Sequence, residues 1–87
     1  MWYVYVLKCE DGKLYTGITD NIGRRFEEHR QGKGGHFTKS FGAVKLLYSE
    51  QCSGKSVALK REVQIKGWMR SKKLALINGD LRLLKRL

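Results

Sequence analysis

A short turn between two strand-like segments is the feature that most restricts how this chain can fold. Residues 2–9 (WYVYVLKC) and 13–19 (KLYTGIT) are rich in aromatic and β-branched side chains, and Glu10-Asp11-Gly12 separates them. Segments of this composition favour extended backbone, and a short turn with glycine joins antiparallel neighbours. The sequence therefore predicts a β-hairpin at the N-terminal end of the chain.

The length of the turn decides which side chains share a face of this hairpin. A two-residue Asp-Gly turn would pair Tyr5 with Ile18 and send Tyr5 and Tyr15 to opposite faces. A three-residue loop with Gly12 in the left-handed region would pair Tyr5 with Gly17 and place both tyrosines on one face. Composition favours the three-residue loop, because it groups the apolar side chains on the other face: Val4, Val6, Leu14, Thr16 and Ile18. Gly17 would then leave open space beside Tyr5.

A helix is predicted directly after the hairpin, over residues 22–31. Thr19, Asp20 and Asn21 are residue types whose side chains cap helices. Gly32 is a typical residue at a helix end, since it adopts the left-handed conformation at no steric cost. The sequence therefore predicts one helix that begins within a few residues of the second strand.

The middle of the chain combines a glycine-rich segment with a third strand. Residues 32–42 contain four glycines among basic and polar side chains and predict a mobile basic loop. Residues 44–50 (VKLLYSE) predict the third strand. No linker or repeat divides the sequence, so the 87 residues are expected to form a single domain with a modest core, 1–87.

Helices are predicted for most of the C-terminal third. Ser53 or Ser56 is expected to cap a helix that reaches about Met69, and a shorter helix is expected from residue 71 or 72 to 78, where a glycine follows. The leucines of residues 80–87 fit either a helix or a strand. The predicted elements are thus strands first and helices afterwards.

Positive charge is the main compositional clue to a partner. The net charge is +10, and it is uneven: residues 1–50 carry 8 basic and 6 acidic side chains, whereas residues 51–87 carry 10 and 2. A cationic half of this kind is typical of a surface that binds a phosphate backbone, although a solvated face, anionic lipid or an acidic protein would also tolerate it. The candidates for backbone contacts are Lys33, Lys39, Lys60, Arg61, Lys66, Arg70, Lys72 and Lys73.

Two further observations bear on where the protein works. The apolar run at residues 2–7 is too short to cross a bilayer and lacks the features of a secretory signal. Cys9 and Cys52 have no metal-ligand spacing and would stay reduced in the cytoplasm. We therefore expect a cytoplasmic protein without a membrane segment, a disulfide or a structural zinc site.

Glu62 is the most unusual single residue. On a helical wheel it lies among Ala58, Leu59 and Met69, inside the apolar arc of its predicted helix. A carboxylate in that position is costly unless it meets a cation. It can pair with Arg25 or another basic side chain, or it can hold a metal ion; one carboxylate with water and phosphate oxygens suits Mg²⁺ or Mn²⁺.

Four other residues could take part in phosphate chemistry. Arg25 and His29 lie four residues apart and can point together toward the sheet. A guanidinium can clamp phosphate and an imidazole can move protons, yet each is more often a surface or core residue. Tyrosines in such a pattern, like Tyr5 and Tyr15, are most often core residues of a sheet. They are candidates for a proton-transfer pair only if they share a face.

The order of these residues resembles that of the GIY-YIG endonucleases. The chain has Tyr3-Val4-Tyr5, then Tyr15-Thr16-Gly17, Arg25 and His29, and finally the segment 58–66 (ALKREVQIK) with its glutamate. The resemblance extends over residues 2 to about 78 and is greatest to small, stand-alone bacterial members. It implies the α+β class, with a small three-stranded antiparallel sheet flanked by helices, and metal-dependent hydrolysis of phosphodiesters.

The same resemblance implies roles for five residues. Tyr15 would act with a metal-bound water as nucleophile or general base, and Tyr5 would support it. Arg25 would hold the scissile phosphate, His29 would lie near the reacting groups, and Glu62 would be the ligand of Mg²⁺ or Mn²⁺. The resulting hypothesis is an endonuclease acting on DNA, with single-stranded or branched repair intermediates as candidate substrates.

The chain departs from the family pattern in its two tyrosine triplets. Tyr3-Val4-Tyr5 lacks the first glycine and the isoleucine, and Thr16 replaces the isoleucine of the second triplet, but the tyrosines remain. Larger members add a DNA-recognition domain for which 87 residues leave no room, so a protein partner could supply specificity. One alternative is a nucleic-acid-binding module with this fold and weak or partner-dependent catalysis; another is a domain that docks an acidic protein.

Overall fold

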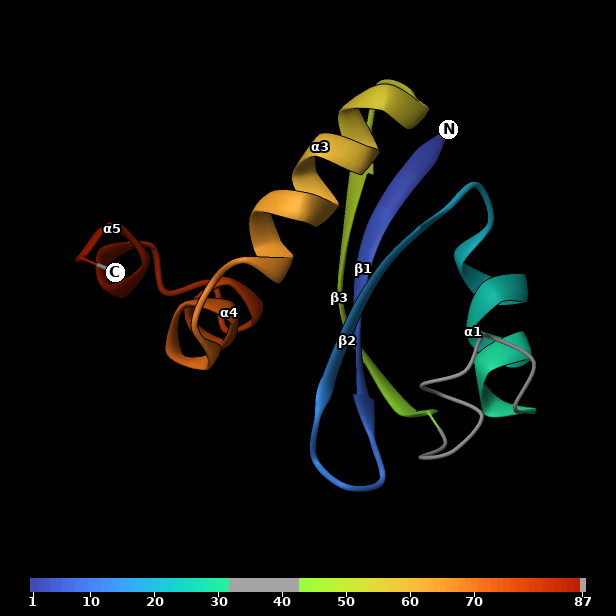
Figure 1. Cartoon of the computed structure of the whole chain (residues 1–87), viewed down its shortest axis with the longest axis horizontal. Coiled ribbons are helices and arrows are strands. Elements are labelled where there is room, and N and C mark those ends of the chain that lie inside the picture. The colour runs from blue at the N-terminus through green and yellow to red at the C-terminus, as the bar shows by residue number, and fades with distance from the viewer. Residues whose placement is uncertain (32–42, 87) are drawn as a thin grey trace.

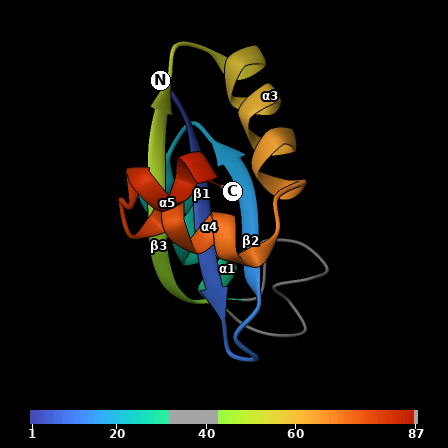
Figure 2. The ribbon, with the colours of Figure 1, turned by 90° about the vertical axis from the view of Figure 1, so that its left-hand side faces the viewer.

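The structure, a computed structural model, describes residues 1–31 and 43–86 as one sheet with helices on both faces (Figure 1). Helix α1 lies on one face, and α3, α4 and α5 lie on the other (Figures 1 and 2). The elements are β1 Trp2–Cys9, β2 Leu14–Thr19, α1 Ile22–Arg30, β3 Ala43–Cys52, α3 Lys55–Lys66, α4 Arg70–Ile77 and α5 Leu81–Arg86. This arrangement confirms the predicted α+β class with a three-stranded antiparallel sheet.

The sheet has the order β2-β1-β3, so the N-terminal strand is central and β2 lies at an edge. Both neighbours are antiparallel to β1. Tyr5 pairs with Gly17 and Leu7 pairs with Tyr15. Gly12 has φ +85°, and its N–H donates to the carbonyl of Cys9 at 2.9 Å. The three-residue loop is therefore confirmed, and the two-residue turn is excluded.

The ends of the helices differ from the prediction in detail. Asn21 caps α1 by accepting a hydrogen bond from the backbone N–H of Arg24 at 3.0 Å. Gly54, rather than a serine, precedes α3, and that helix ends at Lys66, with Gly67 as its C-cap, instead of near Met69. A glycine offers no side-chain cap, so the choice between Ser53 and Ser56 as caps was wrong. The ambiguous tail forms α5, and the loop predicted for residues 32–42 lies outside the described residues.

The main core lies between the sheet and α3. Its fully buried side chains are Val4, Val6, Cys52, Ala58 and Ile65. Half-buried residues surround it, among them Leu14 and Ile18 from β2. These strand residues include the apolar face expected from the three-residue register. Both cysteines are buried free thiols. Among the helices of the described ranges, none combines the length and apolarity needed to cross a membrane.

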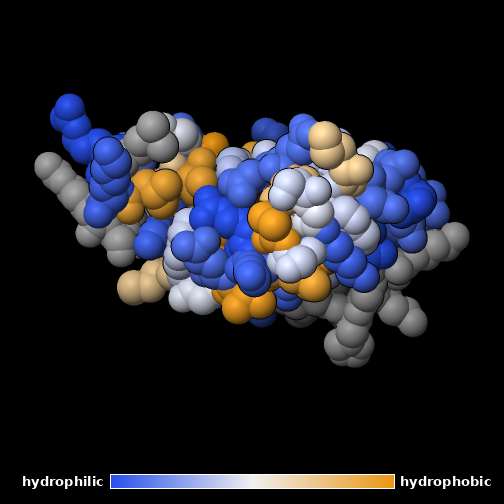
Figure 3. Space-filling view, turned by 90° about the horizontal axis from the view of Figure 1, so that it is seen from above, coloured by the Kyte–Doolittle hydropathy of each residue, from blue (hydrophilic) through white to orange (hydrophobic). Residues whose placement is uncertain are grey.

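The second face of the sheet is closed by α1. Tyr5 and Leu7 of β1 are 2% and 0% exposed, and His29 of α1 is 0% exposed. Apolar side chains also reach the surface, most of them on or next to α3: Met1, Val57, Leu59, Val63 and Met69. Figure 3 shows apolar patches separated by hydrophilic side chains on the face seen from above. The imidazole of His29 is thus a fully buried polar side chain that α1 brings against this face of the sheet.

Thr16 provides a test of the packing on the α3 side. Its side chain is 3% exposed, and its hydroxyl has no hydrogen-bond partner among the described residues. A buried hydroxyl without a partner costs about 1–3 kcal/mol. We therefore expect Thr16→Val to raise the free energy of unfolding by about 1 kcal/mol, measured by urea denaturation.

The matched control for this prediction is Thr19→Val. Thr19 is 4% exposed, but its hydroxyl accepts a hydrogen bond from the N–H of Asn21 at 3.1 Å and donates to its carbonyl at 3.2 Å. Loss of these bonds should lower the free energy of unfolding by about 1 kcal/mol. Equal effects of the two substitutions would contradict the contrast between Thr16 and Thr19.

Candidate active site

Tyr5 lies at the centre of the site because its partner on β2 is Gly17, which has no side chain. It extends from the central strand across β2, and an added Cβ at Gly17 would lie 2.5 Å from its hydroxyl oxygen and 2.7 Å from Cζ. Any side chain at Gly17 would therefore displace the ring. Open space was expected beside Tyr5 at this point, and the ring of Tyr5 itself fills it.

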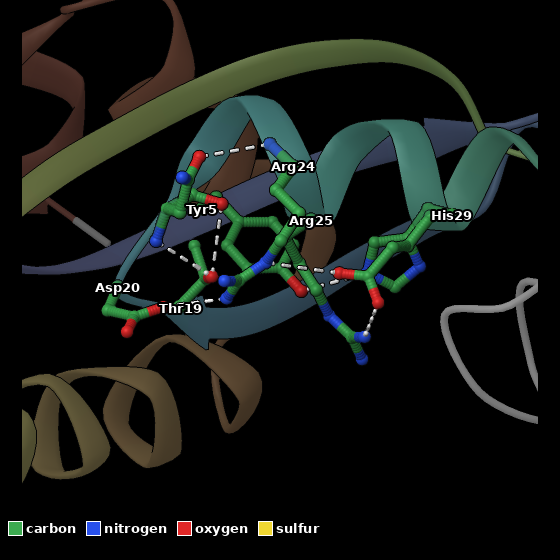
Figure 4. A network of polar contacts seen from close by, with 8 residues as sticks. Tyr5, Thr19, Asp20, Arg24, Arg25 and His29 are labelled. Atoms are coloured by element: carbon green, nitrogen blue, oxygen red, sulfur yellow. Dashed lines mark hydrogen bonds and ion pairs between the residues drawn. The ribbon is translucent and has the colours of Figure 1, made fainter.

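Helix α1 carries the next two residues of the site. Because Asn21 caps the helix two residues after β2 ends, the first turn of α1 begins close to the sheet. Arg25 and His29 lie one turn apart on this helix and both approach Tyr5 (Figure 4). The prediction that these two side chains point together toward the sheet is confirmed.

A hydrogen-bonded cluster joins β1 to α1. The hydroxyl of Tyr5 is 2.8 Å from Nε2 of His29, and the guanidinium of Arg25 also hydrogen-bonds this hydroxyl. The ring of Tyr15 packs against His29 at a centroid distance of 4.9 Å and against Tyr5 at 6.3 Å. The two tyrosines, the arginine and the histidine therefore form one contiguous group.

Burial shifts the pKa values within this cluster. It raises the pKa of Tyr5 to about 12, against the hydrogen bond from Arg25, which lowers it. The charges of Tyr15 and Glu62 raise the Tyr5 pKa further. Burial, and then the charge of Arg25, lower the pKa of His29 to about 4. At neutral pH Tyr5 is therefore a phenol and His29 a neutral imidazole.

These protonation states determine the direction of the hydrogen bonds. A guanidinium can only donate, so the oxygen of Tyr5 accepts from Arg25. The phenol proton can then be donated to Nε2 of neutral His29, which places the ring proton on Nδ1. In this assignment each of the two contacts pairs a donor with an acceptor. Tyr5 thus orients Arg25 and His29 at the same time.

Glu62 lies on α3, on the opposite face of the sheet from α1 (Figure 1). It lies between Ala58 and Ile65 on the buried side of α3, and its side chain is only 16% exposed. The expected neighbours were partly wrong, since Leu59 is 43% exposed and Met69 lies beyond the end of the helix. Helix packing explains the difference: α3 buries a narrow stripe of small and apolar residues against β1 and β2.

The carboxylate of Glu62 has one ion-pair partner on its own helix. Nζ of Lys66 is 3.6 Å away, a loose pair four residues along α3. Arg25, the partner considered from the sequence, has a pair with Glu28 at 3.7 Å instead. Since the charge of Glu62 raises the pKa of Tyr5, the carboxylate acts on the same cluster as Arg25 does from α1. Arg25 and Glu62 thus act on the Tyr5 hydroxyl with opposite effects on its pKa.

The described residues offer few protein ligands for a divalent cation at this site. Among the residues that the structure describes, no three His, Cys, Asp or Glu side chains gather as a protein cage. Glu62 is therefore the candidate ligand, because Glu28, a second carboxylate at the site, pairs with Arg25 at 3.7 Å. Mg²⁺ keeps several waters and is commonly bound through one or two carboxylates together with substrate phosphates, so a one-carboxylate site matches its chemistry.

The basic residues predicted for backbone contacts differ in their surroundings. Lys60, Lys66 and Arg70 are exposed, whereas Arg61 is held by Glu50 at 3.0 Å. Arg61 and Lys72 flank the ring of Trp68, with cation-to-centroid distances of 5.3 and 4.5 Å. Lys73 is half-buried, and Lys33 and Lys39 lie outside the described residues.

One basic residue near the site was absent from the predicted set. Lys13 shares a pocket with Arg70 and Lys73. Lys13 lies only two positions before Tyr15 in the hairpin, which is the signal that could have identified it. Its distant partners on α4 could not be read from the order of residues.

Comparison with known proteins relates this site to others. Residues 1–75 match the sequence profile of the GIY-YIG catalytic domain. The chain is 48% identical over 75 residues to a UPF0213 protein of Staphylococcus aureus, covering 86% of this chain and 92% of that protein. It is 47% identical over 76 residues to a UPF0213 protein of Staphylococcus saprophyticus, covering 87% and 93%.

A solved structure supports the same relationship. The solution NMR structure of a UPF0213 protein from Bacillus halodurans has a TM-score of 0.57 and 37% sequence identity to this chain. The match covers 90% of this chain and 84% of the other. Sequence and fold therefore agree over nearly the same part of the chain.

Proposed function

Since the chain belongs to the GIY-YIG family, a nuclease superfamily whose members generally depend on divalent metal ions, we propose that it is an endonuclease hydrolysing phosphodiester bonds of DNA. The observation that carries the proposal is the contiguous group of Tyr5, Tyr15, Arg25 and His29, together with the little-exposed carboxylate of Glu62 on α3. A phosphate group needs a cationic clamp and a nearby anionic metal ligand, and this arrangement supplies both.

Arg25 is proposed to hold the scissile phosphate. Its side chain is 29% exposed, so part of the guanidinium is accessible while Tyr5 fixes the rest. The planar fork can donate two hydrogen bonds to phosphate oxygens and neutralise the charge that develops on them. Its pair with Glu28 is 3.7 Å long and would be exchanged for the stronger contact with phosphate.

The two tyrosines are proposed to have different roles. Tyr5 is 2% exposed and remains protonated, so it positions Arg25 and His29 rather than taking a proton itself. Tyr15 is half-buried and reaches the surface, where it can orient the attacking water or take its proton. Neutral His29 packs against Tyr15 and supports that ring.

Glu62 is proposed to hold the divalent cation, Mg²⁺ or Mn²⁺. When bound, such a cation neutralises phosphate charge and lowers the pKa of water. The carboxylate is mostly shielded from solvent, on a helix that packs against the sheet. These features keep one negative ligand in place while the remaining ligands come from solvent and substrate.

The proposed substrate class is DNA, in single-stranded or branched form as in repair. The positive charge of residues 51–87 supports a phosphate-backbone partner. A protein partner could add specificity that a small domain lacks. The buried thiols of Cys9 and Cys52 suit the reducing cytoplasm, which remains the predicted location.

The test is strand cleavage by the purified protein. Single-stranded, nicked and branched DNA, with matching RNA, should be incubated with Mg²⁺, with Mn²⁺ or with a chelator. We expect metal-dependent products whose rate falls about 100-fold or more in Glu62→Gln, which removes the proposed ligand of the cation, and in Arg25→Ala, which removes the proposed clamp on the phosphate. Binding measured without metal should survive in Glu62→Gln.

Glu27→Gln is the matched control, since Glu27 is an exposed carboxylate of α1 paired with Arg30. It changes the charge as Glu62→Gln does and should retain cleavage. Cleavage that persists in both site variants would sink the proposed site. Binding without cleavage by the wild-type protein would favour the binding-module alternative instead.

A further inference from the structure

A small pocket lies where the hairpin meets α4. It has a volume of about 210 Å³. It is lined by Lys13 just before β2, by Leu14 at the start of β2, and by Arg70 and Lys73 from the first turn of α4. Both ribbon views place α4 beside the sheet on the α3 side (Figures 1 and 2). Residues almost sixty positions apart therefore form one concave surface.

The charges around this pocket have one sign. Three of its four lining residues are cations, and none is a carboxylate. Arg70 and Lys73 are three residues apart and share one side of α4. Lys13 has a loose ion pair with Asp11 at 3.9 Å, and its side chain is 61% exposed, so this pair is weak. Like charges repel one another, and an anion in the pocket would relieve that repulsion.

The pocket is close to the proposed catalytic strand. The N–H of Cys9 donates to the carbonyl of Lys13 at 2.9 Å, so the hairpin pairing continues to Lys13. Lys13 and Tyr15 are two positions apart along this extended segment, about 6.6–6.8 Å. Tyr15 faces α1, whereas the pocket faces α4 on the other side of the sheet. Because β2 is an edge strand, a nucleic-acid strand that reaches Tyr15 can pass around this edge toward the pocket on the other face.

We propose that Lys13, Arg70 and Lys73 bind a phosphate group of the substrate strand next to the one that is cleaved. This inference rests on the proposed function and deepens it by adding a second phosphate subsite. The ligand is a phosphate oxygen, which can belong to an internal diester or to a terminal monophosphate. The subsite would set the position of the strand, and its residues take no part in the chemical step.

The test is a binding measurement that does not depend on cleavage. Lys13→Gln/Lys73→Gln should be compared with Lys45→Gln/Lys55→Gln, both in the Glu62→Gln background without metal. The control lysines are exposed and lie on β3 and at the start of α3. Fluorescence anisotropy with single-stranded DNA, over a series of salt concentrations, gives the affinity and its salt dependence.

We expect the pocket variant to bind about fivefold more weakly than the control, with a salt slope smaller by about 0.7, the value for one lost phosphate contact on single strands. An equal loss with and without a terminal phosphate on the oligonucleotide identifies an internal diester as the ligand. A loss confined to the phosphorylated oligonucleotide identifies a terminal monophosphate.

Equal affinity and salt slope in the two variants, on both oligonucleotides, would overturn the subsite. The proposed nuclease function would then still stand on the cleavage assay. Conversely, absence of cleavage by the wild-type protein would remove that function without changing the binding result. Thermal denaturation of both variants checks that each is folded, as expected for exposed or half-buried lysines.

Discussion

Gly17→Ala is expected to reduce DNA cleavage about 100-fold and to lower the free energy of unfolding by about 3 kcal/mol. The added Cβ would lie 2.5 Å from the hydroxyl oxygen of Tyr5 and 3.1 Å from a ring carbon of Tyr15. Both rings would have to move. Since Tyr5 contacts His29 and Arg25 through that hydroxyl, their positions would change as well.

The size of this effect follows from the surroundings of Tyr5. The ring is 2% exposed between β2 and α1, so it cannot swing into solvent without opening the packing beneath α1. Adding atoms to a filled interior costs about 1–3 kcal/mol. Displacing catalytic groups by about 1 Å can cost about 100-fold in rate. Urea denaturation and the cleavage assay measure the two losses separately.

Gly23→Ala is the control for this prediction. Gly23 lies in α1, and a Cβ there would meet only the side chain of Asn21, at 3.7 Å. This substitution should leave cleavage unchanged and keep or slightly raise stability, because alanine favours helix. If Gly17→Ala behaved like Gly23→Ala, the close contact between Tyr5 and Gly17 would be refuted.

Mild acid is expected to destabilise the protein through His29. The pKa of His29 is about 4 in the folded state, whereas an unfolded histidine has a pKa of about 6.5. Between these values the unfolded chain binds a proton that the folded protein excludes. The free energy of unfolding should therefore have its full value above about pH 6.5. It should fall by about 3 kcal/mol as the pH approaches 4.

His29→Gln separates this effect from the titration of other groups. Glutamine keeps a side chain that can accept a hydrogen bond from Tyr5 but does not titrate. Urea denaturation at a series of pH values from about 4.5 to 7.5 should show a steep decline for the wild-type protein and a flatter one for the variant. The same decline in both proteins would assign the acid sensitivity to groups other than His29.

Local patterns predicted the framework of the site. The composition of the hairpin favoured the register that places Tyr5 opposite Gly17, and the structure has that register. The i, i+4 spacing placed Arg25 and His29 on one side of α1. Both inferences depend on neighbours within a strand pair or a helix turn, where spacing determines position.

Other features depend on packing between distant elements and could not be predicted. Helix α3 ends at Lys66, so Met69 is not a neighbour of Glu62 within the helix. Glu50 of β3 holds Arg61, although eleven residues and a strand-to-helix turn separate them. The pocket of Lys13 needs α4 to fold back against the hairpin. Each of these contacts joins elements whose relative placement the local sequence leaves open.

The candidate site residues come from distant parts of the chain, and this determines when the site can form during folding. Tyr5, Arg25 and Glu62 come from β1, α1 and α3, which together extend over most of the chain. A partly synthesised or partly unfolded chain with only the hairpin and α1 would lack the carboxylate. Contacts between residues so far apart in sequence form only when loops between them close. If the proposed site is correct, cleavage of phosphodiesters therefore requires the chain to be folded through α3.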